Sequence, residues 1–439
     1  MTTKLLQEAV LDGGIRSVNF FNGRLLTGKD LSREQDARRQ SDRRIAQANG
    51  HGIAWGLEVE NVPAGDPRVR VQPGLAVSRS GRALYLESET EVTLGRRAPP
   101  RAVASRTFDD CGRLTSGTYA AAPGIYLLTL APAEDREGKA LTHALDDAAV
   151  PCNTDTLVEA VQFRLLPLGQ LLEDERLAID QRPSKPDAPA KLSLWRNRIA
   201  HRCFGADALR AFITDPLGAG KEPYGLLAGL ADKALSDCDV PLAIVKLEVN
   251  IDFVDHWSVR RRITQRCAAG AWPMVAGDRR LAEGEAMFLQ FQEHLASLLG
   301  SSADARGISA LQRFDYLPPA GFIPIPGNPT GDAAAIARFF DGLTVRGPAH
   351  MEGANLERLI RDSYAYPPID LASGELIWLY YVRENRQALD YKLTPAPRAC
   401  LVFATGHMPY RADARYNLSR RDYANTPIDR RPAHPIMTE

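Results

Sequence analysis

The sequence predicts an α+β protein with an antiparallel β-sandwich-like N-terminal domain that carries one helix and is followed by mixed α+β regions. Three observations predict it: a polar helical pattern over residues 30–48, alternation of apolar and polar residues from 57 to 94, and a mixture of helical and strand patterns after 179. A chain of 439 residues is too long for one ordinary core. We therefore expect three domains: a β-rich domain at residues 1–178, a mixed α+β domain at 179–309 and an α+β domain at 310–439.

The helical pattern at the N-terminal end is unusually polar. We expect a helix from Asp30 to about Ala48, with Ser32 and Gln35 as a capping box. Opposite charges four residues apart, such as those of Glu34 and Arg38, stabilise a helix by about 0.3 kcal/mol per pair. Such pairs do not hold a helix in place, so packing within the chain or between subunits has to do so.

Strand patterns follow this helix. The segments "LEVENV", "RVRVQPGLAV" and "RALYLESETEVTL" alternate between turns at Pro73-Gly74 and Ser80-Gly81, which predicts an antiparallel meander with one buried face. "GIYLLTLAP", residues 124–132, is expected to be a buried strand. After an Asp- and Ala-rich excursion, "LVEAVQFRLLPL" is expected to return as another.

A break at "DQRPSKPDAPAKLS" separates the β-rich part from the rest. "VPLAIVKLEVNIDFVD" predicts two strands or a hairpin. The helical spacing of Phe288, Phe291, Leu295 and Leu298 predicts an amphipathic helix over residues 279–299. Prolines exclude helix from "FDYLPPAGFIPIPG", which we expect to be irregular and extended. Strands are expected at "ELIWLYYVR" and "ACLVFATG" and helices at residues 194–213, 224–235, 279–299, 332–342 and 356–363.

Composition restricts the function classes. The chain has 54 Lys and Arg and 54 Asp and Glu, so its formal net charge of zero argues against nucleic-acid binding, which needs an excess of cations. No run of about 18 apolar residues is present, so we expect no membrane span. Six scattered cysteines without CxxC, and no secretory signal at the N-terminus, predict separate thiols and a cytoplasmic location.

Motifs for nucleotides and metals are weak. "DPLGAGKEPYG" has Asp215 at the first glycine position of a phosphate loop and Glu222 where Ser or Thr would hold magnesium. Asp252 and His256 lie on one face of an expected strand, where the two side chains could share a cation. The strand ends directly after them, which favours a partly exposed polar edge over a metal site. A second weak metal candidate is a loop containing His143, Asp146, Asp147, Cys152 and Asp155. We expect no cofactor and no metal.

Catalytic signals are also missing, since the chain has neither a GxSxG elbow nor a papain-like cysteine context. The run Arg260–Arg262 favours a solvated face or an intersubunit salt-bridge row over nucleic-acid contact. "YYVRENRQA", residues 380–388, favours a strand cap over a catalytic rim. We expect no catalytic residue, and we keep a hydrolase with a dispersed active site as an alternative.

"FFNGRLLTGKDLSREQ", the polar helix, "HGIAWGLEVE" and "VRVQPGLAVSRSGRALYLE" resemble the start of an uncharacterised bacterial family that often occurs with phage-tail-like contractile injection systems. The order of features is also remotely similar to the N-terminal part of TssK, the baseplate adaptor of the type VI secretion system. The matching residues are Gly23, Leu25, Leu26, Leu31, Gln35, Trp55, Gly56 and Leu57. Arg and Asp replace the glutamines of the TssK helix, so this chain need not oligomerise in the TssK manner.

The resemblance implies a non-enzymatic baseplate or tail-associated adaptor, with the β-rich domain 1–178 as its attachment module. Such an adaptor is expected to assemble in the cytoplasm with other subunits of a tail-like particle and as a homo-oligomer. Leucines are expected to anchor the helix to its sheet, and its charged faces are expected to meet another subunit. The interface expected is Leu25, Leu26, Leu31, Arg38, Arg39, Arg43 and Trp55. The remaining alternative is target recognition by residues after about 180.

Overall fold

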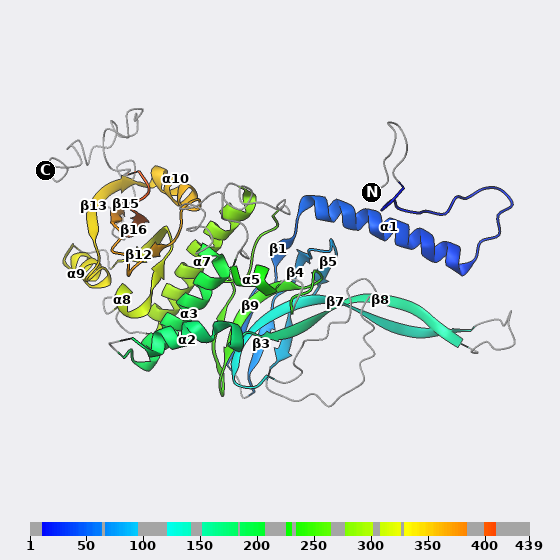
Figure 1. The fold of residues 1–439 in the computed structure, drawn as a ribbon, viewed down its shortest axis with the longest axis horizontal. Coiled ribbons are helices and arrows are strands. Elements are labelled where there is room, and N and C mark those ends of the chain that lie inside the picture. The colour runs from blue at the N-terminus through cyan, green and yellow to red at the C-terminus, as the bar shows by residue number, and fades with distance from the viewer. Residues whose placement is uncertain are drawn as a thin grey trace, which may run out of the picture.

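The computed structural model describes residues 11–63, 66–94, 121–141, 152–182, 185–206, 225–230, 234–264, 277–301, 308–325, 329–383 and 399–409. These residues form an elongated molecule with a C-terminal sheet at one end (Figure 1). At the other end, helix α1 (Gly28–Asn49) and a long hairpin of β7 (Gly124–Leu141) and β8 (Cys152–Pro167) project in the same direction. The α+β prediction is confirmed.

The strands after α1 form two three-stranded antiparallel sheets rather than the single meander expected. One has the order β1-β4-β5 and the other β2-β3-β6. Pro73 and Gly74 direct β3 and β4 into different sheets, and the Leu57 amide donates to the Pro73 carbonyl at this crossing. The bounds are β1 Gly52–Gly56, β2 Val59–Val62, β3 Arg68–Val71, β4 Gly74–Val77, β5 Ala83–Leu86 and β6 Thr90–Thr93.

The central sheet has the order β10-β9-β7-β8, with β9 at Val240–Leu247 and β10 at Ile251–Asp255. The expected β9–β10 hairpin is therefore present. Because β7 pairs with β9, strands from both sides of residue 178 share one sheet and one hydrophobic core. The boundary expected at 178/179 thus divides a continuous sheet.

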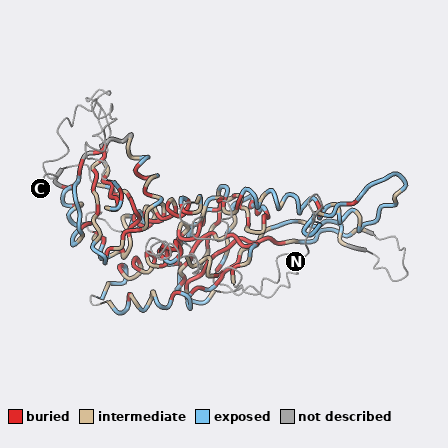
Figure 2. Tube along the Cα trace, turned by 45° about the horizontal axis from the view of Figure 1, so that its top comes forward, coloured by how far each residue is buried: buried red, intermediate tan, exposed pale blue. Residues whose placement is uncertain are grey.

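The β7–β8 hairpin is much longer than the two strands expected. Beyond Pro132 the strands pair only with each other, and their side chains are mostly exposed (Figure 2). Part of the Asp- and Ala-rich excursion is therefore strand, which its composition hides because neither face of this part is buried.

Helices connect the central sheet to the C-terminal part. α3 begins six residues before the start expected at residue 194, because the Asp187 carboxylate caps it by accepting from the Ala190 amide at 2.7 Å. Gly205 in left-handed conformation follows its last residue. The bounds are η2 Gly169–Leu172, α2 Glu173–Asp180, α3 Ala188–Phe204, α5 Gly225–Leu230 and α7 Asp278–Ser301.

The C-terminal sheet has the order β12-β16-β15-β13. "FDYLPPAGFIPIPG" contains strands instead of only irregular chain, since Pro324 ends β12 at the edge of the sheet, where no ladder donor is needed. β11 pairs with β14 in a separate ribbon. The bounds are α8 Ala310–Arg313, β11 Tyr316–Leu317, β12 Ala320–Pro324, α9 Pro329–Phe339, β13 Val345–Glu352, α10 Gly353–Ser363, β14 Ile369–Asp370, β15 Ile377–Arg383 and β16 Ala399–Thr405.

α7 is the amphipathic helix expected over residues 279–299. Its Phe291 and Leu295 lie in the same core as Phe314 and Phe403, so this core crosses the boundary expected at 309/310. Within the described part of the chain, no helix is both long and apolar enough to cross a membrane.

The cysteines differ in one respect from the separate thiols expected. Cys203 and Cys400 are free, but Cys238 is disulfide-bonded, and its partner is not among the described side chains. Burial raises the pKa of Cys203 to about 12.

Candidate functional site

The start of α1 is fixed by Thr27 and Asp30. The Thr27 hydroxyl accepts from the Asp30 amide at 3.3 Å, and the Asp30 carboxylate accepts from the Thr27 amide at 3.0 Å. The Thr27 hydroxyl also donates to the Asp30 carboxylate at 2.7 Å. This bond, the Thr27 amide and the guanidinium of Arg24 2.6 Å away lower the pKa of Asp30 to about 2. The capping box is thus at Thr27 and Asp30 instead of Ser32 and Gln35.

α1 lies against the rest of the chain mainly near its C-terminal end. An added Cβ at Gly81 would lie 2.4 Å from the Arg43 carbonyl oxygen, so the β4–β5 turn closely approaches this end. Ala37 is the one buried residue of the 22 in α1. The segment before the helix contributes buried Val18, whose amide donates to the Glu34 carboxylate at 3.1 Å. Most of the helix surface therefore faces away from its own chain.

The expected leucine anchors are not where the prediction placed them. Leu25 is 89% exposed, and Leu26 and Leu31 are each 53% exposed, so they do not attach α1 to its sheet. Figure 1 shows that α1 extends away from the sheet and that its N-terminal end, next to Leu25 and Leu26, is the end furthest from β1. Trp55, 50% exposed on β1, contacts the exposed Tyr85 ring edge-on.

The expected charged residues have different surroundings. Arg38 is exposed and does not pair with Glu34, whose carboxylate is engaged by Val18. Arg39 reaches Glu159 of β8 at 3.5 Å and Asp36 at 3.9 Å, so part of its charge is balanced within the chain. Arg43 is half-buried.

Large apolar side chains are exposed on this end of the molecule. They lie on the N-terminal segment, α1 and the adjoining strands β1, β5 and β8. The set, called the apolar arm residues below, is Phe20, Phe21, Leu25, Leu26, Leu31, Ile45, Trp55, Tyr85 and Leu157. Exposed apolar residues concentrated in one region mark interaction sites more often than scattered ones do.

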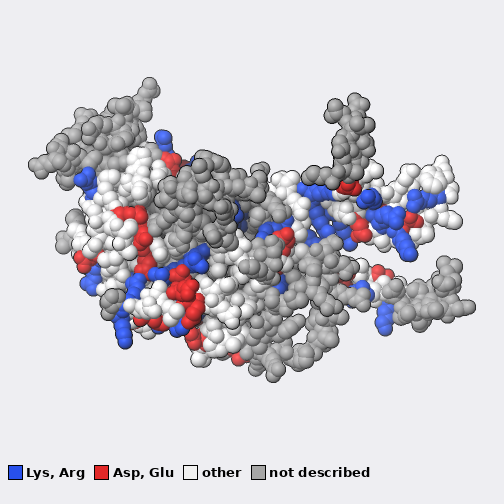
Figure 3. Space-filling view, viewed as in Figure 1, with Lys and Arg blue, Asp and Glu red and all other residues white. Residues whose placement is uncertain are grey.

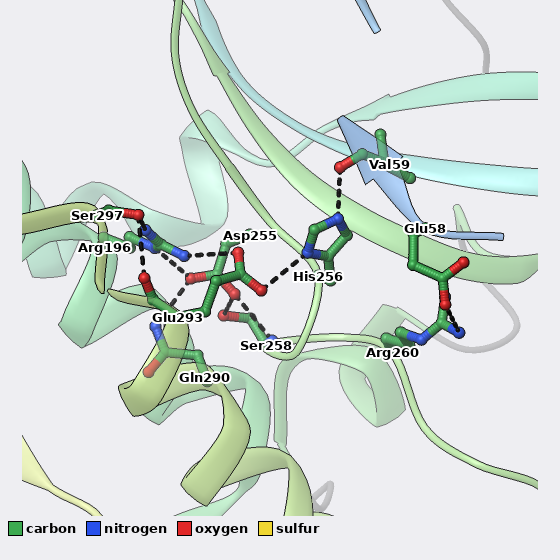
Figure 4. Close-up of polar contacts among 10 residues, drawn as sticks. All are labelled: Glu58, Val59, Arg196, Asp255, His256, Ser258, Arg260, Gln290, Glu293 and Ser297. Atoms are coloured by element: carbon green, nitrogen blue, oxygen red, sulfur yellow. Dashed lines mark hydrogen bonds and ion pairs between the residues drawn. The ribbon is translucent and has the colours of Figure 1, made fainter. Parts of the chain in front are cut away.

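A second feature is a buried ion-pair network where α3, β10 and α7 meet (Figure 4). The Asp255 carboxylate accepts from Arg196 Nε at 2.6 Å, Gln290 Nε2 at 2.8 Å and Ser258 Oγ at 2.6 Å. Arg196 also donates to Glu293 at 3.1 Å. Burial raises the pKa of Asp255, but the Arg196 charge and these hydrogen bonds outweigh it and bring the pKa to about 2.

His256 extends this network to the N-terminal sheets. Its Nδ1 lies 3.0 Å from the Glu293 carboxylate, and its Nε2 donates to the Val59 carbonyl of β2. Burial disfavours the charged ring, but the Glu293 carboxylate, the Val59 carbonyl and Asp255 outweigh burial and raise the pKa of His256. Both ring nitrogens face acceptors, so the protonated ring fits this position.

Sequence reasoning misjudged the basic run at residues 260–262. Arg260 is buried and donates to the Gly56 carbonyl and, at 3.2 Å, to Glu58. Arg261 donates to nearby backbone carbonyls, and Arg262 pairs with acidic residues of α7. The run is neither a solvated face nor a free row for another subunit, because it joins the N-terminal sheets to the helices.

The network does not form an activated nucleophile. The Ser258 hydroxyl donates to Asp255, and the two ring nitrogens of His256 are engaged by Glu293 and Val59. A base that activates a nucleophile needs a hydrogen bond to it. This arrangement therefore ties three elements together and offers no acyl-transfer chemistry.

A cavity of about 280 Å³ lies between the N-terminal sheets, α3, α5 and α7. It is lined by apolar residues and by the charged side chains of Arg79, Asp239, Arg261, Arg279 and Glu283. Asp239 is engaged by Arg164, and Arg279 pairs with Glu283 at 3.2 Å, so the charges of these three lining residues are compensated within the chain.

The remaining motifs lie elsewhere. Asp252 pairs with Lys246 and not with His256. Among the described residues, no group of three or more His, Cys, Asp or Glu side chains could hold a metal ion. The phosphate-loop-like segment and most of the His143–Asp155 loop lie outside the described residues, as do residues 384–388.

Comparison with known proteins gives no family for the chain. No family model matches it, and no curated protein matches it significantly.

Proposed function

We propose that this chain is a non-enzymatic structural adaptor of a phage-tail-like contractile injection particle, located at its baseplate or associated with its tail. The observation that carries the proposal is α1, a helix of 22 residues with a single buried side chain and with exposed apolar residues on it and on the segment before it. The resemblance of about the first ninety residues to an uncharacterised bacterial family that often occurs with contractile injection systems supplies the kind of particle.

The physical argument starts from the stability of α1. In proteins, most of the stability of a helix comes from packing an apolar face against something else and not from the helix propensity of its residues. α1 has little such packing within its own chain. Burying one Leu side chain contributes about 1.5–3 kcal/mol, so covering a few of the apolar arm residues would suffice to fix the helix. We infer that subunits of the particle supply this cover.

The other two readings have less support. The recognition reading needs an exposed aromatic patch after residue 180. Among the described residues of that region, the exposed large apolar side chains are Val249, Leu281, Leu311 and Val345, none of them aromatic. The hydrolase hypothesis needs an activated nucleophile. In the buried network of Figure 4 the Ser258 hydroxyl donates to Asp255, and His256 is engaged by Glu293 and does not contact Ser258.

The test is assembly in cells. The full chain with a C-terminal tag is expected to sediment with purified tail-like particles in fixed proportion to the baseplate, and deleting its gene should leave particles with an incomplete baseplate. A tagged chain absent from the particles, together with intact particles in the deletion strain, would refute the proposal. We expect assembly to take place in the cytoplasm, so cell fractionation should recover the unassembled chain there.

A further inference from the structure

α1 and the far part of the β7–β8 hairpin project together from the N-terminal part of the molecule (Figure 1), and we call them the arm. Its two prongs, one helical and one a hairpin, carry opposite charge. The helical prong is α1, and Figure 3 shows Lys and Arg gathered over it. Two of its four carboxylates face the chain itself, since Asp30 caps the helix and Glu34 accepts from Val18. Its exposed charges are the cations Lys29, Arg33, Arg38, Arg39 and Arg44 and the carboxylates Asp36 and Asp42.

The hairpin prong is the far part of β7 and β8, residues 134–141 and 152–160. It has five carboxylates, Glu134, Asp135, Glu137, Asp155 and Glu159, against two cations, Arg136 and Lys139. Glu134 and Glu159 are directly opposite each other in the ladder, an arrangement that destabilises a sheet unless cations lie nearby. An isolated two-stranded hairpin is itself marginal in water.

The two prongs do not neutralise each other in a single chain. Arg39 and Glu159 join them at 3.5 Å, but these side chains remain 45% and 63% exposed. Among the described residues, Lys29, Arg33 and Arg38 have no carboxylate partner. On the hairpin prong, Glu134, Glu137 and Asp155 have no cationic partner among the described residues.

We propose that the helical prong of one copy of this chain docks on the hairpin prong of a second copy. This inference rests on the proposed function and names the partner of the arm. The occupant is a second copy because each chain carries both members of a complementary pair, a basic helix and an acidic hairpin. Leu157 on the hairpin and Leu31 on the helix, both more than half exposed, supply an apolar centre for the contact.

The experiment uses two charge-reversed variants of the full chain at positions with no partner in their own chain. The helix-reversed variant is Arg33→Glu/Arg38→Glu, and the hairpin-reversed variant is Glu137→Lys/Asp155→Lys. Sedimentation velocity is expected to show association of the wild-type chain and at least about a tenfold weaker association of each variant. Arg358→Glu/Arg361→Glu reverses two exposed arginines of α10, which pair with carboxylates of their own helix; it is the charge-reversal control outside the arm and should associate like wild type.

Mixing distinguishes contact between copies from contact within a chain. An equimolar mixture of the two variants should associate again, since the basic helix of one then meets the acidic hairpin of the other. A chain carrying all four changes should also associate. A monomeric wild-type chain, unweakened variants, or a mixture that stays monomeric would each overturn the inference. A monomeric chain that still enters particles would overturn the inference but leave the proposed function standing.

Discussion

Replacing Arg196 by Met tests whether the buried network of Figure 4 holds α3, β10 and α7 together. Arg196 and Asp255 are both almost inaccessible, and Arg196 supplies the cation nearest the Asp255 carboxylate. Methionine retains an unbranched apolar stem but removes the charge and the donors. The carboxylate would then lie in the core with only Gln290 and Ser258 as donors.

The magnitude follows from the pKa of Asp255. Folding lowers it from 3.8 to about 2, which corresponds to about 2 kcal/mol of stability at neutral pH. Because the folded pKa is depressed, this stability is present above pH 3.8 and is lost as the pH falls towards 2. Breaking a buried pair from one side costs about 3–5 kcal/mol, because the remaining charge is uncompensated. We expect Arg196→Met to cost about 3 kcal/mol at pH 7.

Urea unfolding followed by circular dichroism and tryptophan fluorescence measures this cost. Arg196→Met/Asp255→Asn should be more stable than Arg196→Met alone, because the unpaired charge is gone. Arg358→Met serves as the control, since its side chain is 74% exposed and should change stability by less than about 0.5 kcal/mol. A cost below about 1 kcal/mol for Arg196→Met, or no recovery in the double variant, would refute the reasoning.

Three further predictions concern other parts of the chain. Gly56→Ala should destabilise the chain by about 3 kcal/mol in urea unfolding, because Gly56 has φ +64° and an added Cβ would lie 1.9 Å from the Pro73 oxygen; Gly300→Ala, with no atom within 4 Å, should not destabilise it. Cys203, with a pKa raised by burial to about 12, should resist iodoacetamide at pH 8 until urea unfolds the chain, and mass spectrometry of labelled peptides checks this. The raised pKa of His256 stabilises the fold below about pH 6.5, and this contribution is lost as the pH rises through the folded pKa; urea unfolding of His256→Gln should therefore depend less on pH across that range.

Local patterns predicted the elements whose residues face a core on one side. The spacing of Phe291 and Leu295 identified α7, and the apolar runs of residues 240–255 identified the β9–β10 hairpin. The far part of β7 and β8 has no such face, because polar residues such as Glu137 lie on both sides of the ribbon. The length of that hairpin depends on which residues of β7 pair with which residues of β8. The sequence of one strand alone does not predict this pairing.

The buried network was beyond sequence reasoning for a different reason. Arg196 and Asp255 are 59 residues apart, and nothing in their local sequence marks either as buried. The sequence pairs His256 with Asp252, four residues away, whereas the structure pairs it with Glu293 on helix α7. The cap of α1, in contrast, has a local signal, since Thr27 and Asp30 have the spacing of a capping box.

The polarity of α1 has a physical explanation if the helix belongs to an interface. A helix packed on its own sheet needs an apolar stripe, and α1 buries only Ala37. Its N-cap is nevertheless complete, since Asp30 contacts both Thr27 and Arg24. The chain therefore fixes the start of the helix, although it covers little of the helix surface. Interfaces between separately folded subunits are more polar than domain cores, because each surface has to remain in water before assembly. α1 has a complete N-cap, so it can form before assembly, and its exposed arginines keep its surface in water until a partner covers it.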